Sequence, residues 1–367
     1  MADRSGYAPV DILRDPARVP AYAALDLGTN NCRLLVARQS RRGFRVIDAF
    51  SRIIRLGEGV STTGRLTDEA MARTLDALTI CAQKLERHDG VRKRLVATEA
   101  CRIAENAQSF LTRAREKTGL DIEILSRQEE ARLAVSGCST LIDPNADLVM
   151  VFDIGGGSSE IIWLDLTRAK QRGQRRPLTH RNELDSVIVA WTSLPVGVVT
   201  LAERFGTGPA AGPAFGQMVD YVSQLVSSFE TLWRIGPKLR DRHVHMLGTS
   251  GTVTTLAGIK LGLKRYDRSR VDGCWLETQT VRDITDSLAR RTHEERVHEP
   301  CIGPDRADLV LAGCAILEAL LRQWPCARVR VADRGLREGI LATLMAQDSA
   351  ARGQRAGAST AIPSPAV

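Results

Sequence analysis

The sequence predicts an α/β protein of two domains that face each other across a cleft. Its 367 residues are roughly two to three times the commonest single-domain length, and a hydrophobic content of 43% can supply two cores. A strand, a tight turn and a second strand occur twice, with Asp26 and Asp153 ending the first strand of each unit. Duplication of one α/β unit explains this spacing, and a cleft between two copies is the natural place for a ligand.

The first predicted domain, residues 20–128, alternates strands and helices. Thr67 is expected to cap a helix whose first turn carries Asp68 and Glu69, and a second helix ends at Gly119. Apolar runs bounded by turn residues predict strands at 21–25, 34–37, 94–98 and 122–125.

The second predicted domain, residues 129–335, repeats this alternation and then becomes mainly helical. Helices are expected at 253–259 and 309–321, the latter buried because it is apolar on more than one face. A helix at 336–348 is expected to return to the first domain, and the tail 349–367, rich in Ala, Gly, Ser and Pro, is expected to be disordered. Strands are predicted at 148–152, 160–164, 243–247 and 329–331.

The charge of the chain favours polyanionic ligands. Lys and Arg number 51 against 43 for Asp and Glu, so the formal net charge is +8. A basic stretch at 168–181 is expected to be a solvated loop. Aromatic residues make up only 4% of the chain, which argues against stacking platforms for single-stranded nucleic acid. We therefore expect no nucleic acid as main partner.

The remaining composition is typical of a cytoplasmic protein. The eight cysteines are scattered without a CxxC pair, which indicates reduced thiols. The polar leader, residues 1–19, has no apolar segment of the kind that a secretory signal needs, and no stretch is long and apolar enough to span a membrane. If the protein is an oligomer, a homodimer is the default expectation.

Three glycine-rich turns, each directly after an apolar strand, predict phosphate binding. Small residues let backbone N–H groups converge on phosphate oxygens, although one such turn alone is an ordinary hairpin. None has the spacing of a P-loop or of a dinucleotide-binding motif, so both of those readings are disfavoured. The predicted phosphate ligands are Gly28, Thr29, Asn30 and Arg33 with the first turn, Gly155, Gly156, Gly157 and Ser158 in the second, and Gly248, Thr249, Ser250 and Gly251 in the third.

Six short runs in a fixed order resemble the exopolyphosphatase and guanosine pentaphosphate phosphatase family. The resemblance covers about residues 20–345, and several ordered motifs are hard to match by accident. The runs are Asp26–Asn30, Ala97–Arg102, Glu129–Arg132, Asp153–Glu160, Gly248–Thr252 and Gly335–Gly339.

The resemblance implies the two-domain actin-like ATPase fold, the ribonuclease H-like fold that sugar kinases and heat-shock ATPases share. It also implies metal-assisted attack of water on a terminal phosphoryl group. By the same resemblance Glu130 is the general base, with Glu129 the less favoured choice, and Arg102, with Arg33, offsets the developing charge. Asp26, Asp153 and Glu160 are the implied holders of Mg²⁺.

Plainer explanations exist for single residues. Acids at the start of a helix, such as Glu129 and Glu130, are favourable simply because they oppose the helix macrodipole. Asp153 at a strand end can cap the following turn.

The chain also departs from the family pattern at two positions. Asn31 stands where the family commonly has Ser, and Arg127 stands where it usually has Gly. We expect Arg127 either to lower the pKa of the neighbouring base or to hold an anionic chain near the cleft.

The favoured function is that of an exopolyphosphatase, with guanosine pentaphosphate 5′-phosphohydrolase as the alternative. A non-catalytic sensor of alarmones or nucleotides is a third reading, against which the intact acids Glu130 and Asp153 argue. A kinase would need an acceptor pocket, for which the sequence gives no sign. Larger family members continue into a helical HD-type domain, and this sequence ends before it, so we expect better relative activity on short chains.

Overall fold

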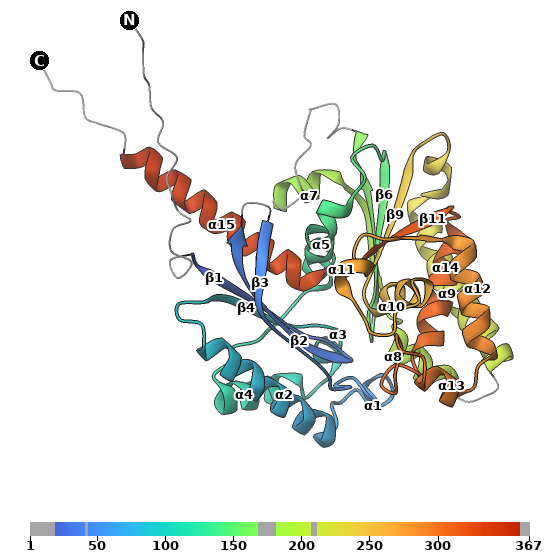
Figure 1. The fold of residues 1–367 in the computed structure, drawn as a ribbon, viewed down its shortest axis with the longest axis horizontal. Helices are drawn as coiled ribbons and strands as arrows, with labels where there is room; N and C mark the ends of the chain where they lie inside the picture. The colour runs from blue at the N-terminus through green and yellow to red at the C-terminus, as the bar shows by residue number, and fades with distance from the viewer. Residues whose placement is uncertain (1–18, 41–42, 168–180, 207–210, 360–367) are drawn as a thin grey trace, which may run out of the picture.

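The computed structural model describes residues 19–40, 43–167, 181–206 and 211–359. The leader before residue 19, most of the basic stretch at 168–181 and the last residues of the tail lie outside these ranges. Two mixed sheets, one in each half of the chain, form the framework, with helices packed on both faces of each (Figure 1). Within the described ranges, every helix is too short or too polar to cross a membrane.

The first sheet has five strands in the order β3-β2-β1-β4-β5. β1 lies at its centre, antiparallel to β2 and parallel to β4. Its alternate side chains are buried on opposite faces: Leu25 and Leu27 pack towards the helices of this half, whereas Tyr22 and Ala24 face α15. The strands are β1 (Ala21–Leu27), β2 (Asn31–Ser40), β3 (Gly43–Ile53), β4 (Arg92–Ala97) and β5 (Glu123–Ile124), and the helices are α1 (Val60–Thr63), α2 (Asp68–Glu86), α3 (Glu99–Ile103) and α4 (Ala107–Thr118).

The second sheet has six strands in the order β10-β11-β9-β6-β7-β8. One of its faces packs on helices that lie between residues 198 and 323, and the other packs on α5 (Arg127–Cys138) and α7 (Arg181–Val187). Its strands are β6 (Leu148–Ile154), β7 (Ser159–Asp165), β8 (Ile188–Leu194), β9 (Val244–Thr249), β10 (Trp275–Glu277) and β11 (Arg328–Ala332). The helices that follow α4 are α5 (Arg127–Cys138), α7 (Arg181–Val187), α8 (Val198–Phe205), α9 (Ala211–Trp233), α10 (Gly251–Lys260), α11 (Arg268–Val271), α12 (Thr278–Arg290), α13 (His293–Val297), α14 (Val310–Gln323) and α15 (Leu336–Ser359).

The two sheets share one strand plan, because β8-β7-β6-β9-β11 repeats the order and directions of β3-β2-β1-β4-β5. Asp26 pairs with Arg33 across the first hairpin, and Asp153 pairs with Glu160 across the second. The two turns also close alike, with Gly28 N donating to Asn31 O at 2.9 Å and Gly155 N to Ser158 O at 3.0 Å. The repeated unit that the sequence predicts is therefore present.

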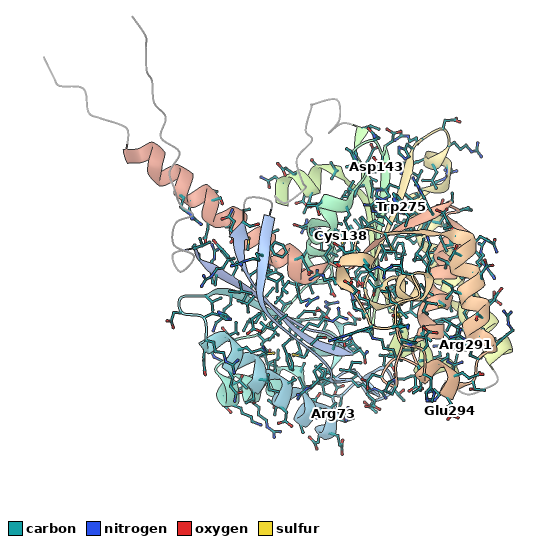
Figure 2. The ribbon with its side chains drawn as sticks, viewed as in Figure 1. Arg73, Cys138, Asp143, Trp275, Arg291 and Glu294 are labelled. Atoms are coloured by element: carbon teal, nitrogen blue, oxygen red, sulfur yellow. The ribbon has the colours of Figure 1, made fainter. Side chains whose placement is uncertain are left out.

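Helices α5 and α15 cross between the two halves (Figure 1). A Cβ added at Gly137 would lie 2.0 Å from the carbonyl oxygen of Gly335, and one at Gly339 would lie 2.0 Å from that of Leu133. Only glycine allows the two helices to approach so closely. Cys138, labelled in Figure 2, lies at the end of α5 and donates its thiol to the carbonyl oxygen of Arg334 at 3.1 Å.

Polar contacts also join the halves at the rim of the cleft. Glu203 of α8 accepts hydrogen bonds from Gly59 N at 2.9 Å and Ser61 Oγ at 2.7 Å. Arg55 and Asp308 form a looser ion pair at 3.7 Å. These contacts are largely exposed, so each contributes only about 0–1 kcal/mol.

Two elements differ from the sequence predictions. The strand expected at 122–125 is reduced to Glu123–Ile124, and α15 continues past residue 348 to Ser359, into the segment expected to be a disordered tail. Its alanines favour the helix. Asp348 also accepts a hydrogen bond from Tyr22 Oη at 2.9 Å, which ties this part of α15 to β1.

Candidate active site

The first two glycine-rich turns meet at the floor of the cleft. A Cβ added at Gly156 would lie 3.0 Å from Thr29 Cβ and 3.2 Å from Asn30 N, and one at Gly157 would lie 2.8 Å from Thr29 Oγ1. The first half therefore meets the second directly through these loops. Asn30 Oδ1 is buried without a hydrogen-bond partner among the described residues, so a polar atom is left for a ligand.

The third turn lines a cavity of about 300 Å³ between the halves. Predicted site residues from both halves line this cavity. Tyr266, Arg306 and Arg337 also line it and were not predicted. Those predicted residues are Asp26, Arg33, Asp153, Thr249, Ser250 and Gly251. A smaller recess of about 70 Å³ shares Arg33, Ser250, Gly251 and Arg306, and adds Asn30, Gly155 and Gly156.

Three arginines at this cavity, Arg33, Arg306 and Arg337, make no ion pair with any residue in the described ranges. Burial lowers the pKa of Arg337, which indicates that its charge is poorly solvated. Unpaired guanidinium groups around a polar cavity favour an anionic ligand. Arg337 lies within the Gly335–Gly339 run and could have been found there, whereas no sequence signal marks Arg306.

Of the predicted metal-holding acids, Asp26 and Asp153 are partly buried in the lining of the larger cavity, and Glu160 is buried. Asp26 and Asp153 end the central strands of the two sheets, and burial raises the pKa of both. The pKa of Asp153 reaches about 6 because Asp26 adds to the effect of burial, although Arg33 opposes it. Burial and the neighbouring charge of Asp153 raise the pKa of Glu160 to about 7.

Glu160 is fixed in place by two hydroxyl groups. Ser158 Oγ and Ser193 Oγ each donate to Glu160 Oε1 at 2.8 Å, and Glu160 is only 2% exposed. Ser193 lies on β8 and was not predicted, because nothing in the sequence marks it beyond its place in a strand.

This set of acids fits magnesium only in part. Within the described ranges no three acidic, histidine or cysteine side chains are grouped closely enough to hold a metal by themselves. Mg²⁺ commonly binds through one or two carboxylates, with water and substrate phosphates completing its shell. The raised pKa values of Asp153 and Glu160 indicate negative charge that a cation would offset.

Glu130 lies in the first turn of α5, which Ser126 caps by accepting from Glu129 N at 3.3 Å. Arg102 Nη2 donates to Glu130 Oε2 at 2.5 Å. Burial raises the pKa of Glu130 well above its usual range, and the charge of Glu160 adds to this, while Arg102 opposes it. A buried carboxylate of raised pKa that a cation holds in place is suited to accept a proton from water.

Glu129 is engaged elsewhere. Its pair with Arg94 at 3.3 Å joins α5 to β4. Its pair with Arg132 at 3.9 Å lies within the first turns of α5. Of the two neighbouring acids, the structure therefore favours Glu130 as the reactive one.

Arg127 does not pair with Glu130. Its guanidinium binds both oxygens of Glu99, at 2.6 and 3.2 Å, and Glu99 also accepts from Arg102 Nη1 at 2.5 Å. The expected lowering of the base pKa by Arg127 does not prevail, because the net direction for Glu130 is upward. Glu99 belongs to the run Ala97–Arg102, but no role was predicted for it.

Comparison with known proteins places both halves in one family. Residues 35–348 match the model of the Ppx/GppA phosphatase family. Exopolyphosphatase 2 of Mycobacterium tuberculosis is 30% identical over 314 residues, which are 82% of this chain and 90% of that protein. The guanosine-5'-triphosphate,3'-diphosphate pyrophosphatase of Photobacterium profundum is 26% identical over 341 residues, 89% of this chain and 60% of that protein.

A solved structure of the same family has a similar fold. The crystal structure of a Ppx/GppA family member from Aquifex aeolicus is 26% identical to this chain, with a TM-score of 0.70. The match covers 90% of this chain and 99% of that one, so the likeness extends through both sheets.

Proposed function

The chain belongs to the Ppx/GppA phosphatase family, and we propose that it is an exopolyphosphatase, which releases orthophosphate from the ends of inorganic polyphosphate. As in its family, the reaction is hydrolysis of a phosphoanhydride bond. The observation that carries the proposal is the position of Glu130, a buried acid that Arg102 holds at 2.5 Å beside Glu160 and the facing phosphate turns. The relative from Mycobacterium tuberculosis, matched over nine-tenths of its length, supports polyphosphate as the substrate.

Each group of residues has a separate role in the proposed hydrolysis. Backbone N–H groups at 29–30 and 156–158 bind the terminal phosphate, since those of Gly28 and Gly155 close the turns themselves. Water attacks the terminal phosphorus, Glu130 takes the proton, and the bridging P–O bond breaks so that the shortened chain leaves with the bonding electrons. Arg102 offsets the charge that develops on the phosphoryl oxygens.

Magnesium is part of this proposal. Asp26, Asp153 and Glu160 would hold the ion, which neutralises phosphate charge when bound. The unpaired Arg33 and Arg306 would attract the polyanion to the cleft.

A second substrate is favoured by the larger cavity. Its volume of about 300 Å³ extends from the third turn to Tyr266, and this is more room than a phosphate chain needs. A guanosine group could occupy that space while its 5′-phosphates reach the same turns. The relative from Photobacterium profundum supports this alternative.

The test compares orthophosphate release from short polyphosphate and from guanosine pentaphosphate, with Mg²⁺, for the wild type and two variants. Glu130→Gln should lower kcat by about 10²–10⁴-fold, the range that a general base contributes. Glu129→Gln is the matched control. It should keep kcat within about threefold, because the Glu129 carboxylate binds Arg94 and Arg132, to which the proposed reaction gives no role.

The outcomes distinguish the proposed functions from one another. Preference for polyphosphate supports the exopolyphosphatase, and preference for the nucleotide promotes the alternative. An active Glu130→Gln protein would contradict the role given to Glu130. Wild-type protein silent on both substrates would favour a sensor.

A further inference from the structure

A buried acid outside the predicted site, Glu99, lies where three parts of the cleft meet. It begins α3 in the first half and is 4% exposed. A Cβ added at Gly157, in the phosphate turn of the second half, would lie 3.2 Å from Glu99 Cγ. Its carboxylate faces the guanidinium groups of Arg102 from α3 and Arg127 from α5. We call Glu99, Arg102, Arg127 and Glu130 the Glu99 network.

The network fixes Arg102 in three directions. Its Nε donates to the carbonyl oxygen of Leu125 at 2.9 Å, its Nη1 to Glu99 at 2.5 Å and its Nη2 to Glu130 at 2.5 Å. The guanidinium plane therefore has one orientation, with Glu99 as its charged anchor opposite Glu130. Such fixed donors stabilise developing charge without having to reorganise during the reaction.

Arg127 balances the charge of the network. Arg102 alone would face two acids, Glu99 and Glu130, and the surplus negative charge would repel an incoming polyanion. Arg127 binds both oxygens of Glu99 and makes the count two cations to two acids. Its side chain is 41% exposed, against 14% for Arg102, so it covers Glu99 from the solvent side.

We propose that Glu99 is a positioning residue for Arg102, and that Arg127 offsets the charge of Glu99 so that Arg102 remains available to a polyanionic substrate. This rests on the proposed role of Arg102 in binding phosphate. The two residues then act on different kinetic constants. Glu99 acts on kcat through the orientation of Arg102, and Arg127 acts on KM through the charge of the cleft.

The experiment is a double-mutant cycle of Arg127→Gln, Glu99→Gln and the double variant, with kcat and KM measured on tripolyphosphate with Mg²⁺. Arg127→Gln should raise KM about tenfold and leave kcat within about threefold, as expected for loss of a charge-assisted contact. Glu99→Gln should lower kcat about tenfold without raising KM. The double variant should combine the low kcat of Glu99→Gln with a KM near that of the wild type, because removing both charges restores the balance.

Two controls accompany the cycle. Arg127→Lys should keep KM near the wild-type value, because the charge is retained. Arg282→Gln removes an arginine that pairs with Glu318 at 3.1 Å on the far side of the second half, and it should change neither constant. Thermal unfolding of every variant shows whether the fold is intact.

A double variant with a KM as high as that of Arg127→Gln, or higher, would overturn the proposal and leave the network a structural ion pair. The same cycle is also measured by calorimetry as binding of a non-hydrolysable, methylene-bridged analogue of tripolyphosphate, with Glu130 left in place so that the charge count is unchanged. Recovery of affinity in the double variant supports the charge balance even if the wild type releases no phosphate, a result that would count against the proposed function alone.

Discussion

At the scale of the residue, the buried acids make the stability of the ligand-free protein depend on pH. The pKa of folded Asp153, about 6, is higher than its ordinary value of 3.8. Such a group contributes stability that is fully present below its unfolded pKa and is lost as the pH rises through its folded pKa. Glu160, with a pKa of about 7, follows the same rule.

Replacing Asp153 by Asn should therefore stabilise the metal-free protein at pH 8, on the order of 1–3 kcal/mol, because the uncompensated buried charge is removed. The gain should shrink towards pH 5, where the wild-type acid is largely protonated. Thermal unfolding at both pH values measures this. Asp76→Asn removes an exposed acid on α2 and should show no such pH dependence. Equal gains at pH 5 and pH 8 would contradict the explanation.

Sequence reasoning at this scale succeeded where a motif or a period was present. The apolar runs at 148–152 and 160–164 are strands β6 and β7, as their pattern predicts. The turns that carry Thr29 and Gly156 meet between the two halves, while their role in binding phosphate stays a prediction. Arg306 and Ser193 could not be found, because they reach the site only through the tertiary packing of a loop and an edge strand.

At the scale of the element, the crossing of α5 and α15 depends on glycine. Gly339→Ala would place a methyl group 2.0 Å from the carbonyl oxygen of Leu133. We expect destabilisation by about 2 kcal/mol or more, because neither helix backbone can yield without moving its half of the fold. Chemical denaturation measures the change in the free energy of unfolding.

Gly216→Ala is the matched control for this prediction. Gly216 lies within α9, and an added Cβ there would meet no atom within 4 Å. Alanine should stabilise that helix by about 0.5–1 kcal/mol. The two Gly→Ala substitutions should thus change the free energy of unfolding in opposite directions. A Gly339→Ala protein as stable as the wild type would show that α5 and α15 can move apart without cost.

The elements with a clear apolar period or capping residue were predictable, as α2 illustrates. Thr67 caps that helix, accepting from Ala70 N at 3.2 Å, as its sequence position indicates. β3 escaped prediction because it is an edge strand in which no side chain is fully buried and polar residues interrupt the apolar ones without a regular alternation. The continuation of α15 escaped because alanine favours both helix and low-complexity tails, and tertiary contacts such as that of Arg352 with Tyr22 decide between them.

At the scale of the whole molecule, the actin-like fold of two α/β halves is confirmed. The repeated Asp-x-Gly turns made the duplication visible in the sequence, whereas the relative position of the halves depends on contacts that no local pattern encodes. Among these are the bonds of Glu203 to Gly59 and Ser61 at the rim.

Removing the rim contacts should open the cleft. We expect the double variant Glu203→Ala, Asp308→Ala to have a larger radius of gyration than the wild type without ligand, because its loss of these contacts leaves fewer bonds between the two halves. Tripolyphosphate with Mg²⁺ should return it to the wild-type value. Small-angle X-ray scattering measures both states, and an unchanged radius without ligand would show that other contacts keep the cleft closed.

The close helix crossing also restricts how the halves can move. With backbone against backbone at Gly137 and Gly339, the halves have no room to slide past each other, so rotation about the crossing is the motion left to them. Displacement in such a rotation grows with distance from its axis. The rim at Glu203 would then travel furthest, while the carboxylates near the axis would keep their spacing through each opening.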